Sequence, residues 1–291
     1  MKWGWLLYEE SDLNNNRDFA VYIEKEGLNY DLRIETVRTA QLSMGVLEGG
    51  TLFIRKDGRE SLPDFVIARH RDALISEQFE YMGIPVFNGS RVCALCNDKR
   101  RTHQFLAGLP MLKTTFINHR YAVAPPPDAY PLVIKPATNH GGEKVRVVDN
   151  EYEWREAADD ILPQDMLMQQ VAGQAGQDLR VYVLFGEIVA AVMRTAKQGF
   201  LSNFKRGGGV GLHTLTTAER SLVQAVIDRF AQTGAPLCLA GVDLLYHNDA
   251  PVLSEVEDVV GSRMLYKVSN IDIAALYLKG IAARLNKTTD A

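Results

Sequence analysis

Residues 240–257, AGVDLLYHNDAPVLSEVE, restrict the fold of this chain more than any other stretch. Two apolar segments flank Asn248, Asp249 and Ala250, a pattern that predicts two antiparallel strands joined by a three-residue turn. In that pairing Asp243 lies directly opposite Glu255, roughly 5 Å away, because facing side chains of an antiparallel pair project to one side. Side chains alternate along a strand, so Glu257 follows on the same face.

Carboxylates gathered on one face repel one another unless a cation lies between them. Magnesium ions that work with phosphates are held by one or two carboxylates, and the remaining positions go to water and phosphate oxygens. A hairpin with a solvated acidic face is the alternative, and for an arbitrary sequence it is the more common one. The apolar Leu244 and Val256 between the acids, and Gly241 and Val242 before Asp243, favour a buried sheet beside a polar cleft.

The composition is typical of a soluble globular protein, with 46% hydrophobic and 23% charged residues. A chain of 291 residues can bury a large core and predicts two domains. Its formal net charge of -4 gives no reason to expect nucleic acid as a partner. No stretch predicts a membrane span or a signal peptide, so we expect a cytoplasmic protein with no membrane partner.

The cysteines are Cys93, Cys96 and Cys238, a set that fits a reducing compartment. Cys93 and Cys96 form a C-x-x-C pattern, but the sequence has no second pair to complete a zinc site. Because Ala94 and Leu95 lie between them, we predict buried structural thiols, with redox chemistry as the alternative.

Strand and helix patterns alternate in the N-terminal part of the chain. Apolar strands are predicted at residues 3–8, 32–36, 65–67 and 85–87, with helical patterns among them. This alternation is typical of a small parallel sheet covered by helices. We therefore predict an N-terminal domain over residues 1–89.

Two later helices have clear start signals. Asn97 or Asp98 can cap a helix that begins at Lys99. Thr216 and Glu219 form a capping box that opens another helix.

Lys135 combines two signals of phosphate binding. It ends the apolar strand 132–135, and it is followed by the glycine turn 139–142, whose backbone amides can approach an anion. Lysine supplies a point charge for phosphate. An edge-strand lysine without a ligand is the alternative.

Arg180 and Arg194 fall on the two strands of a predicted hairpin, where arginines seldom lie without an anionic partner. The segment 197–209, KQGFLSNFKRGGG, is rich in glycine and basic residues. It fits a flexible exposed loop. Beside three carboxylates it also fits a lid from which Arg206 reaches a phosphate and Asn203 offers an oxygen to a metal.

Taken together, these segments resemble an ATP-grasp ligase, and they are most similar to the RimK type, which adds glutamate to a carboxylate of an acceptor. The similarity covers about residues 90–283 and is looser in the N-terminal domain. The matching stretches are Asn97-Asp98-Lys99, residues 131–135, residues 181–191, Ala196-Lys197, Ser202-Asn203, Arg206-Gly207-Gly208, residues 240–244, Glu255 and Ile271-Asp272-Ile273-Ala274. The set of motifs is specific, although no single motif is.

The resemblance implies an α/β (α+β) chain with the ATP-grasp fold. A parallel α/β domain of the pre-ATP-grasp kind would cover residues 1–89, and the ATP-grasp domain would cover residues 90–291. The nucleotide would be held between two α+β subdomains, a central lid at about 105–170 and a C-terminal metal-binding subdomain at about 171–291.

The resemblance also implies a role for each site residue. The nucleotide-binding residues would be Lys99 and Lys135 at the phosphates, Gly141 and Gly142 in the phosphate turn, Gln169, Gln170 and Val171 at adenine, and Asp178 at the ribose. The catalytic residues would be Arg180, Arg206 and Asn203, and the metal ligands would be Asp243, Glu255 and Glu257.

The implied activity is that of an acid–amino acid ligase. A carboxylate attacks the terminal phosphate of ATP, with one Mg²⁺ ion or two and with Mn²⁺ as a substitute, and an amine then displaces phosphate from the acyl phosphate to form an amide. Glutamate is the first choice of amine donor, and another amino acid is the alternative. The acceptor carboxylate belongs to a small molecule or a peptide, and assembly into a homo-oligomer is left open. An ATP-binding sensor that has lost catalysis is the competing hypothesis.

Four features depart from the family pattern. Glu257 stands where asparagine is usual, and its extra charge predicts tighter magnesium binding. The turn at residues 258–263 lacks the usual proline and small residues. Lys144 replaces a second glycine in the phosphate loop, and the lid segment after Lys197 is a residue shorter than expected. The substrate is therefore less constrained by the resemblance than the nucleotide is.

Overall fold

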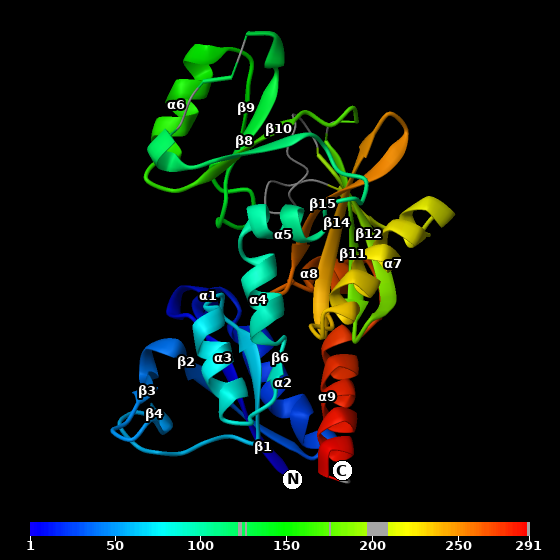
Figure 1. The fold of residues 1–291 in the computed structure, drawn as a ribbon. Helices are drawn as coiled ribbons and strands as arrows, with labels where there is room; N and C mark the ends of the chain where they lie inside the picture. Colours follow the sequence, from blue (N-terminus) through cyan, green and yellow to red (C-terminus); the bar gives the residue numbers. More distant parts are fainter. Residues whose placement is uncertain (122–123, 126, 175, 197–208, 290–291) are drawn as a thin grey trace.

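The computed structural model describes residues 1–121, 124–125, 127–174, 176–196 and 209–289. Within them the strands form three larger sheets and one separate hairpin (Figure 1). Short 3₁₀ turns lie at η1 (Leu28–Tyr30), η2 (Thr39–Gln41), η3 (His119–Tyr121) and η4 (Pro127–Ala129).

A parallel sheet with the order β2-β1-β5-β6 forms the N-terminal part. Its strands are β1 (Lys2–Tyr8), β2 (Leu32–Arg38), β5 (Phe65–Arg69) and β6 (Val86–Phe87), its helices are α1 (Glu10–Asn15), α2 (Arg17–Gly27) and α3 (Ala73–Tyr81), and the hairpin pairs β3 (Leu42–Val46) with β4 (Leu52–Lys56). Alternate residues of β1 face opposite sides, so Leu6 packs with Ile23 of α2 and Trp5 packs with Phe79 of α3. The predicted parallel sheet is confirmed.

An antiparallel sheet with the order β7-β10-β8-β9 forms the part at the top of Figure 1, and we call it the lid sheet. Its elements are β7 (Thr114–Ile117), β8 (Leu132–Pro136), β9 (Arg146–Val148), β10 (Met166–Gln170) and the helix α6 (Glu151–Ile161). Trp154 and Ile161 of α6 pack against Ile134 and Met166 of the sheet. Helices α4 (Ser90–Cys96) and α5 (Lys99–Phe105) lead from the N-terminal sheet to this region.

A second antiparallel sheet, with the order β13-β12-β11-β14-β15, carries most of the predicted site, and we call it the carboxylate sheet. Its strands are β11 (Gln177–Leu184), β12 (Glu187–Thr195), β13 (Gly209–Leu212), β14 (Leu239–His247) and β15 (Ala250–Glu257), and its helices are α7 (Thr217–Gln232), α8 (Arg263–Val268) and α9 (Ile273–Thr289). Helix α7 covers one face, and α8 and α9 cover the other. Helix α9 also packs on the N-terminal sheet, so one apolar core joins the two sheets.

The start signals of two helices are confirmed. The Asp98 carboxylate accepts a hydrogen bond from the Arg100 amide and caps α5. Thr216 and Glu219 form both bonds of the capping box at α7, and the Tyr246 hydroxyl also donates to Glu219.

The predicted three-residue turn between β14 and β15 is wrong, but the prediction that Asp243 lies opposite Glu255 is confirmed. The turn has two residues, Asn248 and Asp249, with φ of 50° and 59°, which is the conformation that favours Asn and Asp in tight hairpins. A turn one residue shorter would place Ser254 opposite Asp243. A β-bulge between Asp243 and Leu244 shifts the register, and Asp243 pairs with Glu255.

The cysteines are buried and unlinked, as expected for structural thiols. Burial raises the pKa of Cys93, Cys96 and Cys238 above the ordinary value of a thiol, which disfavours the reactive thiolate. In the described ranges no helix has the length and apolar character to cross a membrane. Residue 89 lies between β6 and α4, 105 is the last residue of α5, and 170 is the last of β10, while the domain limits stay predictions.

Candidate active site

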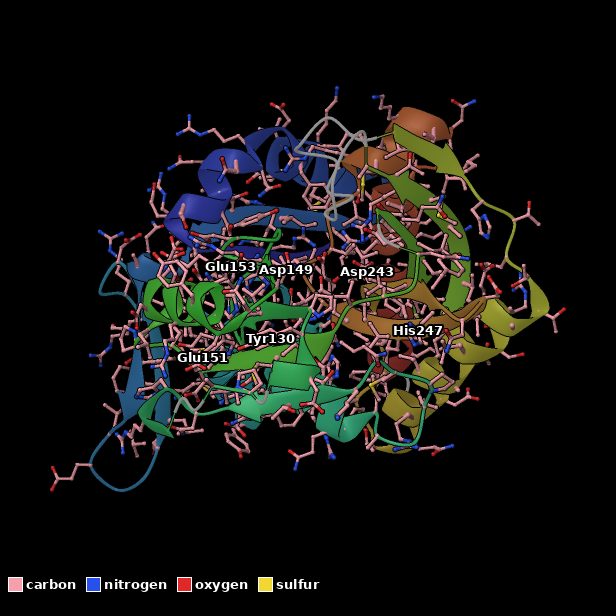
Figure 2. The ribbon with its side chains drawn as sticks, turned by 90° about the horizontal axis from the view of Figure 1, so that it is seen from above. Tyr130, Asp149, Glu151, Glu153, Asp243 and His247 are labelled. Atoms are coloured by element: carbon pink, nitrogen blue, oxygen red, sulfur yellow. The ribbon has the colours of Figure 1, made fainter. Side chains whose placement is uncertain are left out.

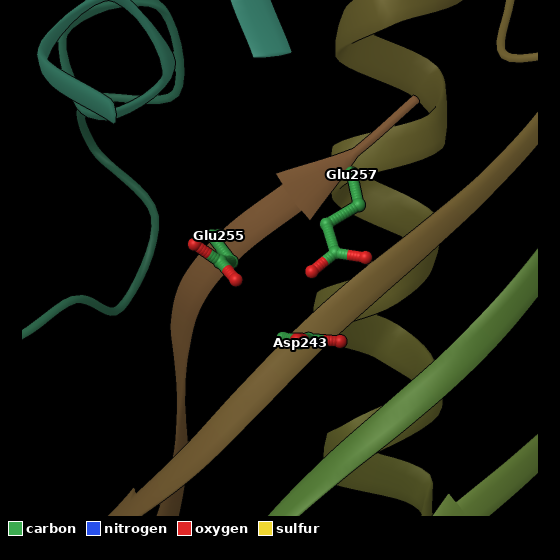
Figure 3. A group of neighbouring side chains, drawn as sticks. All are labelled: Asp243, Glu255 and Glu257. Carbon is green, nitrogen blue, oxygen red and sulfur yellow. The ribbon is translucent and has the colours of Figure 1, made fainter. Parts of the chain in front are cut away.

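The three acids predicted as metal ligands lie together. Asp243 comes from β14, and Glu255 and Glu257 come from the neighbouring β15. One carboxylate oxygen of each lies within 4.8 Å of the other two, and their carboxyl groups face a common space (Figure 3). Viewed from above, Asp243 lies toward the middle of the molecule, whereas Asp149 and the acids at the start of α6 belong to the lid sheet (Figure 2).

Two buried arginines hold the first of these acids. Arg180 is the β11 residue directly beside Asp243, and its Nε and Nη2 donate to the two Asp243 oxygens at 2.8 and 2.6 Å. Arg194 of β12 donates from Nη2 to the same carboxylate at 2.7 Å and from Nε to Asp178. Arg180 also lies 2.7 Å from Glu257. The expectation that strand arginines have anionic partners is confirmed.

These contacts set the charge state of the acids. Burial would raise the pKa of Asp243, but Arg180 and Arg194 outweigh it and hold that pKa at about 2. Burial would likewise raise the pKa of Glu255, but Lys99 and then Lys135 lower it. The pKa of Glu257 is raised by burial and by its two acidic neighbours, against the effect of Arg180.

The two predicted phosphate-binding lysines reach the same region from two elements, Lys99 from helix α5 and Lys135 from strand β8. The Lys99 ammonium, at the start of α5, lies 3.6 Å from Glu255 and donates to the Asn139 carbonyl oxygen. Lys135, near the end of β8, donates to the Gln169 side chain at 3.1 Å. Burial lowers the pKa of Lys135 to about 8. Two positive groups therefore lie beside the acids, on the side of the lid sheet.

The three residues predicted to bind adenine differ in burial and in whether they line a cavity. Gln169 is buried, and its amide also donates to the Thr114 hydroxyl at 2.8 Å. Gln170 is exposed, with its amide 3.5 Å from the His247 ring, and Val171 is half-buried. Of these three residues only Gln169 lines the cavity between the lid sheet and the carboxylate sheet.

A phosphate turn follows Lys135. Gly141 and Gly142 have φ of 67° and 74°, a conformation that glycine adopts without strain. Both line the cavity that also contains Lys99, Lys135 and Asp178, and we call it the nucleotide cavity. Lys144 also has a positive φ, of 56°, so the position that departs from glycine keeps the glycine-like backbone.

A second cavity of about 510 Å³ meets the first at the acids, and we call it the substrate cavity. The two share the residues Lys99, Gly141, Gly142, Arg194, Asp243 and Glu255. Beyond this common wall the substrate cavity extends to the carboxyl ends of β1 and β5 and to the turn at residues 258–261. A group in one cavity can therefore meet a group in the other at the carboxylates.

The sequence did not assign several residues of the substrate cavity to the site. Asn97 donates to the Asp258 carboxylate at 2.9 Å, whereas the helix cap is Asp98. Burial raises the pKa of Asp258 to about 7. Arg69 and Tyr8, which end two neighbouring parallel strands, line the same space. Ligands commonly bind at such strand ends, and that signal could have found them.

Two predicted catalytic residues, Asn203 and Arg206, lie outside the described residues, as does the lid segment from Lys197. Their roles stay predictions. The donor set that is described consists of carboxylate oxygens, which are the ligands that Mg²⁺ and Mn²⁺ prefer. The Asp243 oxygens are bonded to arginines, so the partly exposed Glu255 and Glu257 offer the more accessible oxygens.

Comparisons with known proteins agree with this geometry. The family model of the RimK-like ATP-grasp domain matches residues 96–281. A probable alpha-L-glutamate ligase 2 of Shewanella frigidimarina is 34% identical over 229 residues, which cover 74% of this chain and 73% of that protein. A probable alpha-L-glutamate ligase 1 of Shewanella denitrificans is 34% identical over 73% of this chain and 74% of its own length.

Solved structures share the fold at low identity. The crystal structure of D-cycloserine synthetase DcsG has a TM-score of 0.72 at 17% identity, covering 97% of this chain and 99% of that one. The D-alanyl-alanine synthetase A from Vibrio cholerae has a TM-score of 0.71 at 15% identity and covers 98% of each chain. These likenesses confirm the predicted ATP-grasp fold.

Proposed function

The chain belongs to the RimK-like ATP-grasp family, and we propose that it is an ATP-dependent ligase that joins the carboxylate of an acceptor to the amine of an amino acid, with glutamate as the first choice. Membership confirms the resemblance found in the sequence. It also favours an enzyme over an inactive sensor, because the relatives are named as ligases. The observation that carries the proposal is the meeting of two cavities at Asp243 and Glu255, with Glu257 beside them in the substrate cavity.

The nucleotide cavity supports ATP as the phosphate donor. The family fold is one that binds ATP, and a solved relative of this fold, a D-alanine–D-alanine ligase from Bacillus anthracis, is described as complexed with ATP. In this chain Lys99, Lys135 and the turn at Gly141 and Gly142 line one cavity. Ammonium groups and backbone amides together are suited to a polyphosphate. We propose that they orient the terminal phosphate toward the acids.

ATP-grasp ligases work with a divalent metal, and we propose Mg²⁺, with Mn²⁺ as a substitute, held by Asp243, Glu255 and Glu257. The fit is chemical: these residues offer hard oxygen ligands on one face, within 4.8 Å of one another. When bound, such an ion neutralises charge on the phosphate oxygens. Arg180 bridges Asp243 and Glu257 and so fixes the positions of two of the three ligands.

The proposed reaction has two steps. An oxygen of the acceptor carboxylate attacks the terminal phosphorus of ATP, the bond to ADP breaks, and an acyl phosphate forms. The amine then attacks the acyl carbon, phosphate leaves, and the amine loses a proton to give an amide. Neither step needs a protein nucleophile, so positioning and charge neutralisation by Lys99, Lys135 and Arg180 are the contribution of this chain.

The test is ADP release by the purified protein with Mg²⁺, ATP, a panel of carboxylate acceptors and pooled amino acids. A ligase releases ADP in an amine-dependent manner and forms an amide detectable by mass spectrometry. Binding of ATP with no amine-dependent ADP release from any pool would contradict the proposal and favour the sensor. Glu255→Gln serves as the matched inactive variant.

A further inference from the structure

The lid sheet directs a row of polar side chains toward the nucleotide cavity. Gln169 of β10 pairs with Thr114 of β7 on one side and with Val133 of β8 on the other. Lys135 lies two residues beyond Val133, so it projects from the same face of the sheet as Gln169 and Thr114. Lys135 and Gln169 line the cavity, while the opposite face of the sheet packs against α6.

Three of these side chains form a hydrogen-bond chain that has one direction. The Thr114 hydroxyl donates its hydrogen to the Leu112 carbonyl oxygen at 2.9 Å, so its oxygen accepts a hydrogen bond from the Gln169 amide at 2.8 Å. The Gln169 amide oxygen is then turned toward Lys135, whose ammonium donates to it at 3.1 Å. With the amide turned round, an N–H donor would face the ammonium, which has no lone pair to accept it. The Thr114 hydroxyl therefore decides which end of Gln169 meets Lys135.

The direction of this chain matters because the lysine is buried among mixed charges. Only 7% of Lys135 and 3% of Gln169 is exposed. Burial lowers the pKa of Lys135, Glu255 of β15 raises it and Lys99 of α5 lowers it. His103 of α5 faces the same ammonium, and burial lowers the pKa of His103 to about 4, so it adds no charge at neutral pH. The Gln169 oxygen is thus a fixed partner for an ammonium that burial disfavours.

We propose that Thr114 and Gln169 are positioning residues for Lys135, which hold its ammonium charged and directed into the nucleotide cavity, and that the Gln169 side chain does not select the base. The oxygen and the nitrogen of the Gln169 amide are both engaged within the lid sheet, at Lys135 and at Thr114. The inference rests on the proposed function, because it assigns Lys135 to the phosphates of ATP. It gives the Gln169 side chain a different role from the adenine contact that the resemblance implies.

The test is isothermal titration calorimetry of the full chain with a nonhydrolysable ATP analogue and Mg²⁺, from about pH 7 to about pH 10. In wild type the affinity should fall as Lys135 loses its proton. Thr114→Val removes the hydroxyl at nearly constant volume, so the amide can turn its N–H toward the lysine. The midpoint of the alkaline fall should move to lower pH, and affinity at neutral pH should drop about 2- to 10-fold. Thr114→Ser keeps the hydroxyl and should restore both wild-type values.

Gln169→Glu should move the midpoint in the opposite direction. It keeps nearly the same shape but places a negative charge beside the ammonium, so the midpoint should rise by about one pH unit. A side chain that reads adenine would change the affinity equally at every pH, and a merely structural role would not move the midpoint. Thr115→Val is the matched control, because Thr115 is the exposed neighbour of Thr114 on β7. Should Gln169→Glu fail to fold, the contrast between Thr114→Val and Thr114→Ser decides.

A midpoint that moves no further in Thr114→Val than in Thr115→Val, or a wild-type affinity without an alkaline fall, would overturn the positioning role. Amine-dependent ADP release would then leave the ligase function standing. Conversely, opposite shifts in Thr114→Val and Gln169→Glu without ADP release from any amino acid would retain the positioning role and reject the ligase. A wild type that binds no ATP analogue would overturn both.

Discussion

The two cavities that meet at the acids differ in how their polar walls are partnered. In the nucleotide cavity Asp243 is bonded to Arg180 and Arg194, and Lys135 is bonded to Gln169. Among the described residues, every buried unpartnered side-chain atom lies outside that wall. The wall of the substrate cavity, in contrast, includes the unpartnered Tyr8 hydroxyl and Arg69 Nε.

The difference in partnering indicates that the polar groups of the two cavities are positioned in two ways, one by contacts within the protein and one by contacts with a ligand. Ion pairs within the protein position the nucleotide groups before any ligand arrives, so substitutions there should also cost stability. Groups without protein partners leave their hydrogen bonds to the ligand, so substitutions there should cost substrate affinity and little stability.

The largest expected effect is on turnover, at the wall that the cavities share. Glu255→Gln removes a charge from the proposed metal site and should reduce amine-dependent ADP release by on the order of 10³-fold. Stability should change by less than about 1 kcal/mol, because Glu255 is partly exposed and its ion pair with Lys99, the one found for it among the described residues, spans 3.6 Å. Steady-state ADP release and urea unfolding measure both quantities, and activity near that of wild type would remove Glu255 from the site.

Asp243→Ala should have the largest effect on stability. It leaves Arg180 and Arg194 buried without their main partner, and breaking a buried ion pair in this way costs about 3–5 kcal/mol. Urea unfolding of Asp243→Ala beside Tyr8→Phe tests the comparison directly, and equal losses of stability would contradict it.

Lys135 tests the nucleotide side through pH. Burial lowers its pKa to about 8, so the free protein loses this charge as the pH rises through about 8. We expect kcat/KM for ATP to fall above that pH, while kcat holds to higher pH because bound phosphates favour the ammonium. Lys135→Gln should raise KM for ATP about 10- to 100-fold.

Lys135→Arg is the control for this pH dependence. It keeps a charge that does not titrate, so the alkaline fall in kcat/KM should disappear. A fall that persists unchanged in Lys135→Arg would assign the titration to another group.

The smallest expected effect is that of Glu257→Asn, which restores the residue usual in the family. It removes a charge that Arg180 already offsets at 2.7 Å. The Mg²⁺ concentration needed for half-maximal turnover should rise no more than about tenfold. A loss as large as that of Glu255→Gln would show that the two glutamates are equivalent ligands.

The sequence identified the charged centre because its residues follow strand periodicity. Asp243, Glu255 and Glu257 share a face when the register places Asp243 opposite Glu255. The two-residue turn at Asn248 and Asp249 alone would have broken that register, and the bulge restores it. The local sequence pattern shows neither the bulge nor the register that the bulge restores, because both depend on how β15 packs against its neighbours.

The substrate cavity was not predictable in the same way. Arg69 ends an apolar strand of a parallel sheet, where ligands commonly bind, but nothing local shows that its side chain is buried. Its burial depends on Phe19 and Val260, which are distant from it in the sequence. Whether a polar atom has a partner is a property of tertiary packing, so periodicity and capping signals carry no information about it.

The most direct test of the central claim is a crystal structure of the chain with Mn²⁺ and a nonhydrolysable ATP analogue. We expect an anomalous peak for Mn²⁺ in contact with Glu255 and with a phosphate oxygen, and the Lys99 and Lys135 ammonium groups within hydrogen-bond distance of the phosphates. A nucleotide bound away from both lysines, or a metal peak remote from Asp243, Glu255 and Glu257, would contradict it.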